Sequence, residues 1–501
     1  MPRFVVGLVL VAAGLPAAVI RGTVVENQTS KPLSRAVVSL EPVSGTPANP
    51  VMARTNIYGA FEFSSLPAGA YVVKASRRGF RTAEYGQKNW KAAGRPVAVA
   101  AETAAFLTLR LPRYGAITGT VLDENDVGLP QQIVLAYRAA EPPELVSRAV
   151  SDERGVYRIS GLEPGAYLVR TAGFRDEDID YLPTFSKETL RMEQARMVDV
   201  YLEEDTRNVD VRPLMGTLFT ISGTVITNPP GVPVSITLAS DTGRQTVPGP
   251  AFQFTGLPPG PYELYAEVRE NPTLRAAFQA AYTPLRLERN LLGLTLSLQP
   301  VRESRVELAP PLEDSAPVQL LVRRKDYAGV GPVQMPPLGN GRVLLGPGRW
   351  ELSLRPPHGY YVSGFSGPSL PSLPSGSSNW PDGWNEAAFT SLGQIKFSLA
   401  SGAGSSHGLV MAAGDPVAGV PVYLEAYDPD TRKRLSDLRT TRTDLRGMYR
   451  FDDLAPGIYR VLGTFEYQDP DSGAMDLATA RPIKIEAHSD LEMDLDLYGE
   501  R

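Results

Sequence analysis

One short phrase returns five times along this chain of 501 residues, and no other feature constrains the fold as strongly. Each copy has a Leu, two residues that include a Pro, a Gly, one variable residue and a Tyr, which the fourth copy replaces with Trp. The copies of this Pro-Gly phrase occupy residues 66–73, 162–169, 257–264, 345–352 and 454–461. Consecutive copies are 96, 95, 88 and 109 residues apart, from Gly to Gly. Such intervals are too long for solenoid or propeller repeats and match sandwich domains of about 100 residues.

The residues around the Pro-Gly phrase predict β-hairpins. In three copies an Asn or Asp with a Gly three residues later precedes the phrase, at 56–59, 152–155 and 444–447. The Asx side chain can bond the backbone two residues on, and Gly adopts the positive φ that closes such a turn. Alternating apolar residues follow, which is typical of a strand with one buried face. The repeated residues are therefore predicted to be structural: Gly69, Tyr71, Gly165, Tyr167, Gly260, Tyr262, Gly348, Trp350, Gly457 and Tyr459.

A second phrase, Gly-Thr-Val, opens three of the repeats at residues 20–24, 117–121 and 221–225, and a weaker form lies at 408–410. Because the order of the parts is preserved, we predict an all-β chain, a tandem array of about five β-sandwiches. The predicted domains are 19–113, 114–217, 218–300, 301–402 and 403–501.

Two stretches interrupt the repeat pattern. Residues 187–196 are rich in helix formers and predict a short helix. Residues 366–393 begin rich in Pro, Ser and Gly and predict a long loop in a divergent fourth domain. The joints between domains are short, so we expect a semi-rigid rod.

The N-terminus and the composition indicate an exported protein. Residues 1–18 hold one Arg, an apolar run and small residues at the end, which predicts a secretory signal peptide; a misplaced translation start is the alternative. The chain has no Cys, so neither disulfides nor thiolate metal sites are available. A net charge of -5 gives no footprint for nucleic acid, and no later stretch is long and apolar enough for a membrane span. We therefore expect a secreted, periplasmic or cell-surface bacterial protein.

The paired phrases resemble the carboxypeptidase regulatory-like domain family. The resemblance implies an immunoglobulin-like or transthyretin-like (carbohydrate-binding-like) β-sandwich of about seven strands, often strung together in exported bacterial proteins. It is fullest in the first, second and fifth domains. The third replaces the Asx-Gly turn with residues 247–250, and the fourth lacks the opening Gly. Membership in this family implies a fold and an exported location, but no reaction.

No pattern of catalytic or metal-binding residues stands out. The three histidines, His358, His407 and His488, begin neither H-x-x-E nor H-E-x-x-H, and no G-x-S-x-G elbow occurs. The chain is therefore predicted to be no enzyme and to need no cofactor. Asp469, Asp471 and Asp476 are weak calcium candidates because calcium prefers several carboxylate oxygens in one tight loop. The alternative is that these are solvated turn residues, and no metal site is predicted.

Aromatic residues in the fourth domain offer the best candidate binding site. Trp380 and Trp384 flank Asp382, and Tyr360 and Tyr361 precede them. Exposed aromatic rings beside carboxylates suit the apolar faces of sugars. Trp90 is a second candidate. The alternative is that the loop buries its aromatics against its own domain to stay ordered.

These observations predict a non-catalytic exported multidomain binding protein that holds carbohydrate through exposed loop aromatics. The alternative is a structural or adhesive rod that makes protein-protein contacts at the cell envelope through edge strands. The expected partners are polysaccharide or envelope proteins, and not nucleic acid.

Overall fold

The structure is a computed structural model of the chain. It describes residues 18–43, 50–139, 144–176, 178–228, 230–240, 243–268, 281–298, 304–312, 318–324, 333–334, 341–343, 345, 348–368, 380–389 and 393–499. These described residues form five two-sheet sandwiches, numbered 1 to 5 in chain order, each around its own apolar core. The predicted all-β fold is confirmed. Nearly all of the predicted signal peptide lies outside the described residues.

Sandwich 1 begins at Ala18, which is fully buried. Its strands are β1 (Ala18–Glu26), β2 (Val37–Pro42), β3 (Val51–Arg54), β4 (Ala60–Leu66), β5 (Gly69–Arg77), β6 (Phe80–Glu84), β7 (Val97–Val99) and β8 (Ala104–Leu111). One sheet has the order β4-β1-β8, and the other has the order β3-β2-β5-β6 with β7 also beside β5.

Sandwiches 2 and 3 repeat this plan. Sandwich 2 contains β9 (Gly115–Thr120), β10 (Ile133–Arg138), β11 (Glu144–Val150), β12 (Val156–Leu162), β13 (Gly165–Thr171), β14 (Phe174–Asp176), β15 (Ile179–Tyr181), the 3₁₀ turn η1 (Met192–Gln194), β16 (Val198–Val200) and β17 (Asp205–Thr206). Sandwich 3 contains β18 (Phe219–Thr227), β19 (Val234–Ser240), β20 (Gly243–Pro248), β21 (Ala251–Leu257), β22 (Gly260–Val268), β23 (Ala281–Leu287) and β24 (Leu291–Leu298). The sheet orders are β12-β9-β17 with β11-β10-β13-β16, and β21-β18-β24 with β20-β19-β22-β23.

Sandwiches 4 and 5 complete the described chain. Sandwich 4 contains β25 (Ser304–Ala309), β26 (Gln319–Arg324), β27 (Val333–Gln334), β28 (Arg342–Val343), β29 (Gly348–Arg355), β30 (Tyr360–Ser366), β31 (Asn385–Phe389) and β32 (Gln394–Ser401). Sandwich 5 contains β33 (Gly404–Ala412), β34 (Asp415–Pro416), β35 (Pro421–Asp428), β36 (Lys433–Arg434), β37 (Arg439–Arg442), β38 (Met448–Leu454), β39 (Gly457–Gly463), the helix α2 (Ser472–Leu477), β40 (Arg481–Ile485), β41 (Asp490–Glu492) and β42 (Leu495–Asp496).

Two sequence predictions fail in detail. The helix expected at 187–196 is only the three-residue turn η1, because Lys187 and Glu188 have positive φ values of 76° and 54° that no α-helix tolerates. The loop expected at 366–393 contains strand β31, which pairs with β29. Across this pair, Nη2 of Arg349 lies 2.6 Å from Oε1 of Glu386.

The Gly-Thr-Val phrase places glycine where two neighbouring strands approach most closely. Each opening strand makes antiparallel pairing and also pairs parallel with the last strand of its sandwich, as β1 does with β4 and β8. Gly22 lies opposite Phe61 in this register, and a Cβ at Gly22 would stand 2.8 Å from the Phe61 ring and overlap the Leu107 carbonyl oxygen. The same pairing with an aromatic residue recurs in other sandwiches: Gly119 with Tyr157, Gly223 with Phe252 and Gly408 with Tyr449. Glycine there lets an aromatic ring cover the opening strand.

The Pro-Gly phrase forms a turn that its own tyrosine fastens. The hydroxyl of Tyr71 donates to the carbonyl oxygen of Pro67, four residues earlier, at 2.8 Å. Tyr167, Tyr262 and Tyr459 make the same contact at 2.8 to 2.9 Å. Such a tyrosine corner holds the strand that follows against the core of the sandwich. In the fourth copy Trp350 packs against the core of sandwich 4.

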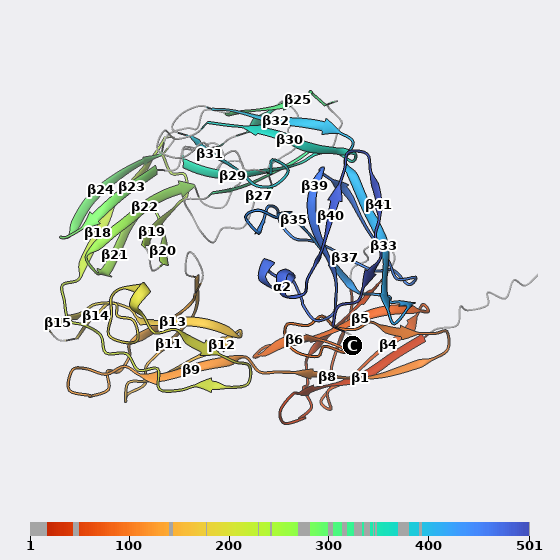
Figure 1. Cartoon of the computed structure of the whole chain (residues 1–501). Coiled ribbons are helices and arrows are strands. Elements are labelled where there is room, and N and C mark those ends of the chain that lie inside the picture. The colour runs from red at the N-terminus through yellow and green to blue at the C-terminus, as the bar shows by residue number, and fades with distance from the viewer. Residues whose placement is uncertain are drawn as a thin grey trace, which may run out of the picture.

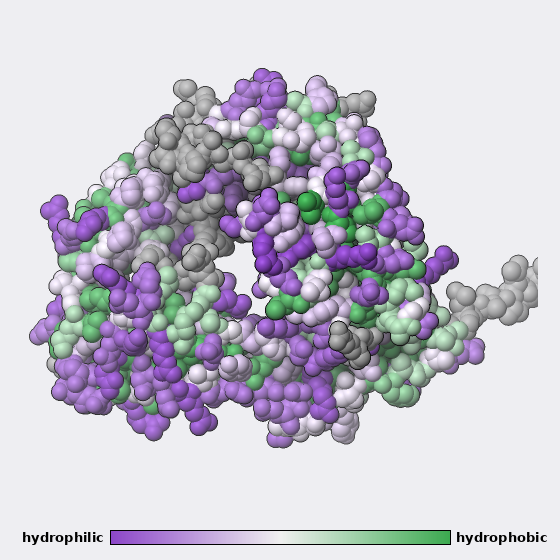
Figure 2. All heavy atoms as spheres, in the orientation of Figure 1, coloured by the Kyte–Doolittle hydropathy of each residue, from purple (hydrophilic) through white to green (hydrophobic). Residues whose placement is uncertain are grey.

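The five sandwiches curve into a ring instead of the expected rod (Figure 1). The sheet with the opening strand faces outward in each sandwich, and the sheet with the Pro-Gly strand faces the middle. Figure 2 shows an opening through the middle of the molecule. Sandwich 5 returns to sandwich 1, so the ends of the row meet. Among the described residues, no helix is long and apolar enough to cross a membrane.

Candidate functional site

Trp380, the leading sugar-binding candidate, lies between sandwiches 4 and 5. Its ring meets the ring of Tyr459 edge-on, with centroids 5.6 Å apart and planes at 85°. A Cβ at Gly457 would overlap the Trp380 ring. The candidate loop of the fourth sandwich therefore rests on the Pro-Gly phrase of the fifth.

Trp384 contributes to the same junction. Its indole Nε1 donates to Oδ2 of Asp437 in sandwich 5 at 3.0 Å, and the Arg323 guanidinium lies 4.2 Å from its ring centroid. Both Trp rings are half-buried. The two Trp rings of this loop thus contact the next sandwich as well as their own.

Asp382 fixes this loop to the neighbouring strand β30. Its Oδ1 accepts a hydrogen bond from the Val362 backbone amide at 2.9 Å. Burial raises the pKa of Asp382 to about 6. The amide of Asn385 adds bonds to the carbonyl oxygens of Pro381 and Gly383. Tyr360 and Tyr361, on β30, are half-exposed, and Tyr360 packs against the core of sandwich 4.

Trp90 also lies near a junction between sandwiches. The cations of Arg81 and Lys91 lie 5.7 Å and 5.0 Å from its ring centroid. Arg81 in turn donates to Glu163 of sandwich 2 at 2.8 Å. Glu163 belongs to the Pro-Gly phrase of sandwich 2, so this phrase too carries a contact from a neighbouring sandwich.

The three histidines lie in separate places and do not meet one another in a site. Nδ1 of His358 lies 2.8 Å from Oδ1 of Asp453, across the junction of sandwiches 4 and 5, and this hydrogen bond raises the pKa of His358. The His488 backbone amide donates to the Gly402 carbonyl oxygen at 2.8 Å.

Ser405, His407 and Asp490 bring triad residue types together on sandwich 5, but not in catalytic order. The Ser405 hydroxyl donates to Oδ1 of Asp490 at 2.5 Å, and His407 Nδ1 lies 3.0 Å from the same oxygen. A nucleophilic serine needs the imidazole as its base, with the carboxylate behind that imidazole. Here the Ser405 hydroxyl donates its hydrogen bond to the Asp490 carboxylate and not to the His407 imidazole.

Two of the three calcium candidates have other roles. Asp471 caps helix α2 by accepting from the Ala474 amide at 2.7 Å, and Asp476 forms ion pairs with Arg460 and with Arg432 at 3.6 Å. Within the described ranges no three His, Asp or Glu residues are grouped as metal ligands.

A buried charge pair in sandwich 5 was not predicted. Glu425 is fully buried on β35 and lies opposite Arg460 on β39, whose Nε donates to it at 2.8 Å. Burying two charges is favourable only with close pairing and further hydrogen bonds. Arg434 adds a second partner at 2.5 Å. The sequence signal was a lone Glu inside an apolar strand.

The contact that closes the ring was also missed from the sequence. Residues 85–96, here called the closure loop, connect β6 and β7 of sandwich 1 and lie against sandwich 5. The backbone amide of Ala93 donates to the Phe465 carbonyl oxygen at 2.7 Å, and that of Gln468 donates to the Lys91 carbonyl oxygen at 2.5 Å. Ala93 is 2% exposed and belongs to the core cluster of sandwich 5.

Charged groups surround this closure. Lys88 pairs with Glu466, and the Arg95 guanidinium lies 5.3 Å from the centroid of Phe465. Glu84, buried at the base of the loop, faces Arg442 of sandwich 5 at 3.8 Å and Lys74 of its own sandwich at 3.4 Å. The first and fifth sandwiches are thus joined by backbone, apolar and charged contacts.

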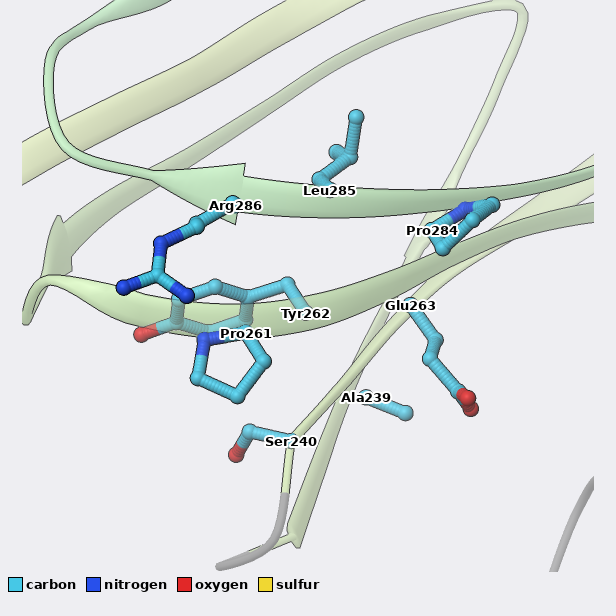
Figure 3. Close-up of a pocket in the computed structure, with 8 residues that line it drawn as sticks. All are labelled: Ala239, Ser240, Pro261, Tyr262, Glu263, Pro284, Leu285 and Arg286. Carbon is cyan, nitrogen blue, oxygen red and sulfur yellow. The ribbon is translucent and has the colours of Figure 1, made fainter.

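A groove of about 640 Å³ lies on sandwich 3 (Figure 3). The residues that line it are Ala239, Ser240, Pro261, Tyr262, Glu263, Pro284, Leu285 and Arg286. Its charged groups have partners within the chain, since Tyr282 donates to Glu263 at 3.2 Å and Arg286 pairs with Glu288 at 2.7 Å.

Comparison with known proteins supports the resemblance for the first sandwich. Residues 19–111 match the carboxypeptidase regulatory-like domain family, which confirms that resemblance where it was predicted to be full. A search of curated proteins finds no match to this chain.

Solved structures similar to this chain include three pilins. The minor pilin of Streptococcus agalactiae is 13% identical, with 40% of this chain and 97% of the pilin covered and a TM-score of 0.25. A streptococcal ancillary pilin is 11% identical, with 56% and 99% covered and a TM-score of 0.18. The major pilin subunit of Bacillus cereus is 11% identical, with 78% and 100% covered and a TM-score of 0.15. At these values we infer function from the residues of this chain alone.

Proposed function

We propose that this protein is a non-catalytic structural protein that makes protein-protein contacts at the cell envelope. One observation carries the proposal: the side chains with the most distinctive chemistry hold the sandwiches to one another. Trp380 contacts Tyr459, Trp384 bonds Asp437, His358 pairs with Asp453 and Arg81 pairs with Glu163. Such residues build a frame, and the frame presents its outer surfaces to partners.

The edge strand β11 is the surface on which we expect a protein partner to bind. It lies at one edge of its sheet, and Leu145 and Val150 near its two ends are 46% and 54% exposed. An edge strand offers unpaired backbone donors and acceptors to an extended segment of another protein. Strand addition at β11 would continue the sheet β11-β10-β13-β16 into the partner.

A photo-cross-linking amino acid at Leu145 tests this contact in cells that export the protein. We expect an adduct larger than the chain, and we expect Val150→Lys to reduce its yield because a charge on an edge opposes strand addition. Leu477→Lys is the matched control, since Leu477 is 77% exposed on helix α2 and on no strand edge. Recovery of the monomer alone from the Leu145 probe would contradict the proposal.

Carbohydrate binding is the second candidate function. It is supported by the half-exposed rings of Tyr360 and Tyr361 beside the Trp380 loop, and by the carbohydrate-binding-like fold that the resemblance implies. Replacing Trp380 and Trp384 by Ala should abolish retention on a polysaccharide array if these rings stack on sugar. The same change loosens the junction, so Tyr361→Ala is needed beside it. Wild-type retention by both variants would exclude this site.

The proposed location rests on the predicted signal peptide at residues 1–18. We propose that the mature chain is secreted, periplasmic or on the cell surface. Sequencing the N-terminus of the protein purified from its host tests the cleavage. A mature chain that retains Met1 in the cytoplasmic fraction would contradict export.

A further inference from the structure

Several hydrogen bonds within sandwich 1 shape the closure loop. The Gln87 side chain donates to the Ala92 carbonyl oxygen at 2.6 Å, and Oδ1 of Asn89 accepts from the amides of Lys91 and Ala92. Oε2 of the buried Glu84 accepts from the Gly94 amide at 2.8 Å. All of these partners lie in sandwich 1, so these hydrogen bonds do not depend on sandwich 5.

The surface that receives the loop is equally independent. Thr464 bonds Pro421 and Tyr498 of its own sandwich and so holds the following Phe465 in place. Gly419, in the turn before β35, has a φ of +71°, and a Cβ there would overlap the Pro96 ring of sandwich 1. We call Gly419, Arg442, Phe465, Glu466 and Gln468 the closure site. Two surfaces that are both formed in advance lose little conformational entropy when they bind.

The two surfaces are complementary but different, and one chain carries one of each. A contact between unlike surfaces can be made within a chain or between two chains. Within a chain the two surfaces are tethered to each other, which makes closure an intramolecular event, so a single chain closes on itself first. Between chains the same contact becomes available whenever closure within the chain is prevented.

We propose that the closure loop of one copy binds the closure site of a second copy, which joins sandwich 1 of one chain to sandwich 5 of another. Reciprocal exchange gives a closed dimer, and exchange in one direction gives a row of chains. The self-closed ring is then the monomeric form, in which both surfaces are occupied. This proposal rests on the structural role proposed above, because a row of chains is an extended form of the same frame.

Complementation between two defective chains tests the proposal. Ala93→Asp places a charge in the core contact of the loop, and Gly419→Asn blocks the closure site, because Asn tolerates positive φ while its Cβ meets Pro96. Each variant alone has one defective surface and should remain a single open chain. Their mixture restores one intact loop facing one intact site and should give a particle with twice the mass of one chain in light scattering.

The controls isolate the closure contact from folding. Gly414→Asn also places Asn at a positive φ, +92°, but a Cβ there meets nothing within 4 Å. Ala98→Asp introduces the same charge as Ala93→Asp, but on an exposed residue of β7. Both should stay closed and should not associate when mixed. A chain with both Ala93→Asp and Gly419→Asn should not associate with the Ala93→Asp chain, because that mixture contains no intact loop.

Two outcomes overturn the proposal. The first is a mixture of Ala93→Asp and Gly419→Asn chains that keeps the mass of one chain at the highest soluble concentration. The second is that either variant keeps the wild-type radius of gyration, because the contacts described would then not close the ring. Neither outcome touches cross-linking at Leu145, so pairing of chains and partner binding at β11 can fail separately.

Discussion

Close packing requires a glycine at position 22, in contrast to a glycine that only marks a turn. Gly22 lies between β4 and β8, where a Cβ would overlap the Leu107 carbonyl oxygen and stand 2.8 Å from the Phe61 ring. Carbon atoms in contact are normally about 3.5–4.0 Å apart, so the ring alone must move by about 1 Å. Overpacking of this kind costs about 1–3 kcal/mol, and displacement of the parallel pairing adds about 1 kcal/mol. Gly22→Ala should therefore destabilise sandwich 1 by roughly 2–4 kcal/mol.

Gly69→Ala is the matched control in the same sandwich. A Cβ at Gly69 would lie 3.8 Å from the Tyr71 ring, an ordinary contact, and Gly69 does not have a positive φ. Replacing Gly by Ala at such a position is neutral or stabilises by about 0.4–1 kcal/mol through the unfolded chain. Thermal unfolding with hydrogen exchange of the β1 and β8 peptides reports on sandwich 1 alone. We expect Gly22→Ala to lower that transition by at least about 8 °C. An equal effect of the two substitutions would refute the packing argument.

Three further changes test other parts of the structure. Tyr167→Phe removes the hydroxyl bond to Glu163 and should cost about 1 kcal/mol in thermal unfolding of sandwich 2, whereas Tyr201→Phe, at an exposed tyrosine, should change nothing. Burial raises the pKa of Asp382 to about 6, so the folded protein binds the proton more tightly than the unfolded chain; the resulting stabilisation is complete below about pH 4 and is lost as pH rises through 6. Asp382→Asn should therefore raise the unfolding temperature at pH 8 and leave it unchanged at pH 4, and a pH-independent difference would contradict the burial of this carboxyl group. Trp380→Ala should widen the distribution of distances between spin labels on sandwiches 4 and 5, because it empties the space between Gly457 and Tyr459; an unchanged distribution would show that other contacts hold the junction.

The sequence predicts the sandwich fold because its signals are local. An Asx residue, a Gly with positive φ and a tyrosine that bonds four residues back each act within a few positions, as at Asp152, Gly155 and Tyr167. Repetition then identifies them as structural, since a feature needed by every sandwich must recur in each. The opening glycines follow the same logic, although their close contact with the last part of the sandwich comes from residues about 70 to 90 positions away.

The ring and its junctions could not be predicted because they depend on angles between sandwiches. Trp380 and Trp384 looked exposed in a loop of polar and small residues, and their partners Tyr459 and Asp437 carry no pattern that points to them. In the closure loop the sequence singles out only Trp90, whereas the buried anchor is Ala93, a residue without any distinguishing chemistry. Differences between repeats locate the junctions, but they do not say whether a neighbouring sandwich or a ligand covers them.

Small-angle X-ray scattering of the whole chain tests the closed arrangement most directly. Strands of nine residues at about 3.3 Å per residue make a sandwich about 30 Å long, so a straight row of five would span about 150 Å. A ring of the same contour is about 50 Å across its centre line and about 80 Å across its outer surface. The structure predicts a maximum dimension of about 80 Å for the wild-type chain. Ala93→Asp should increase this dimension. A wild-type dimension near 150 Å, unchanged by Ala93→Asp, would contradict the closed ring.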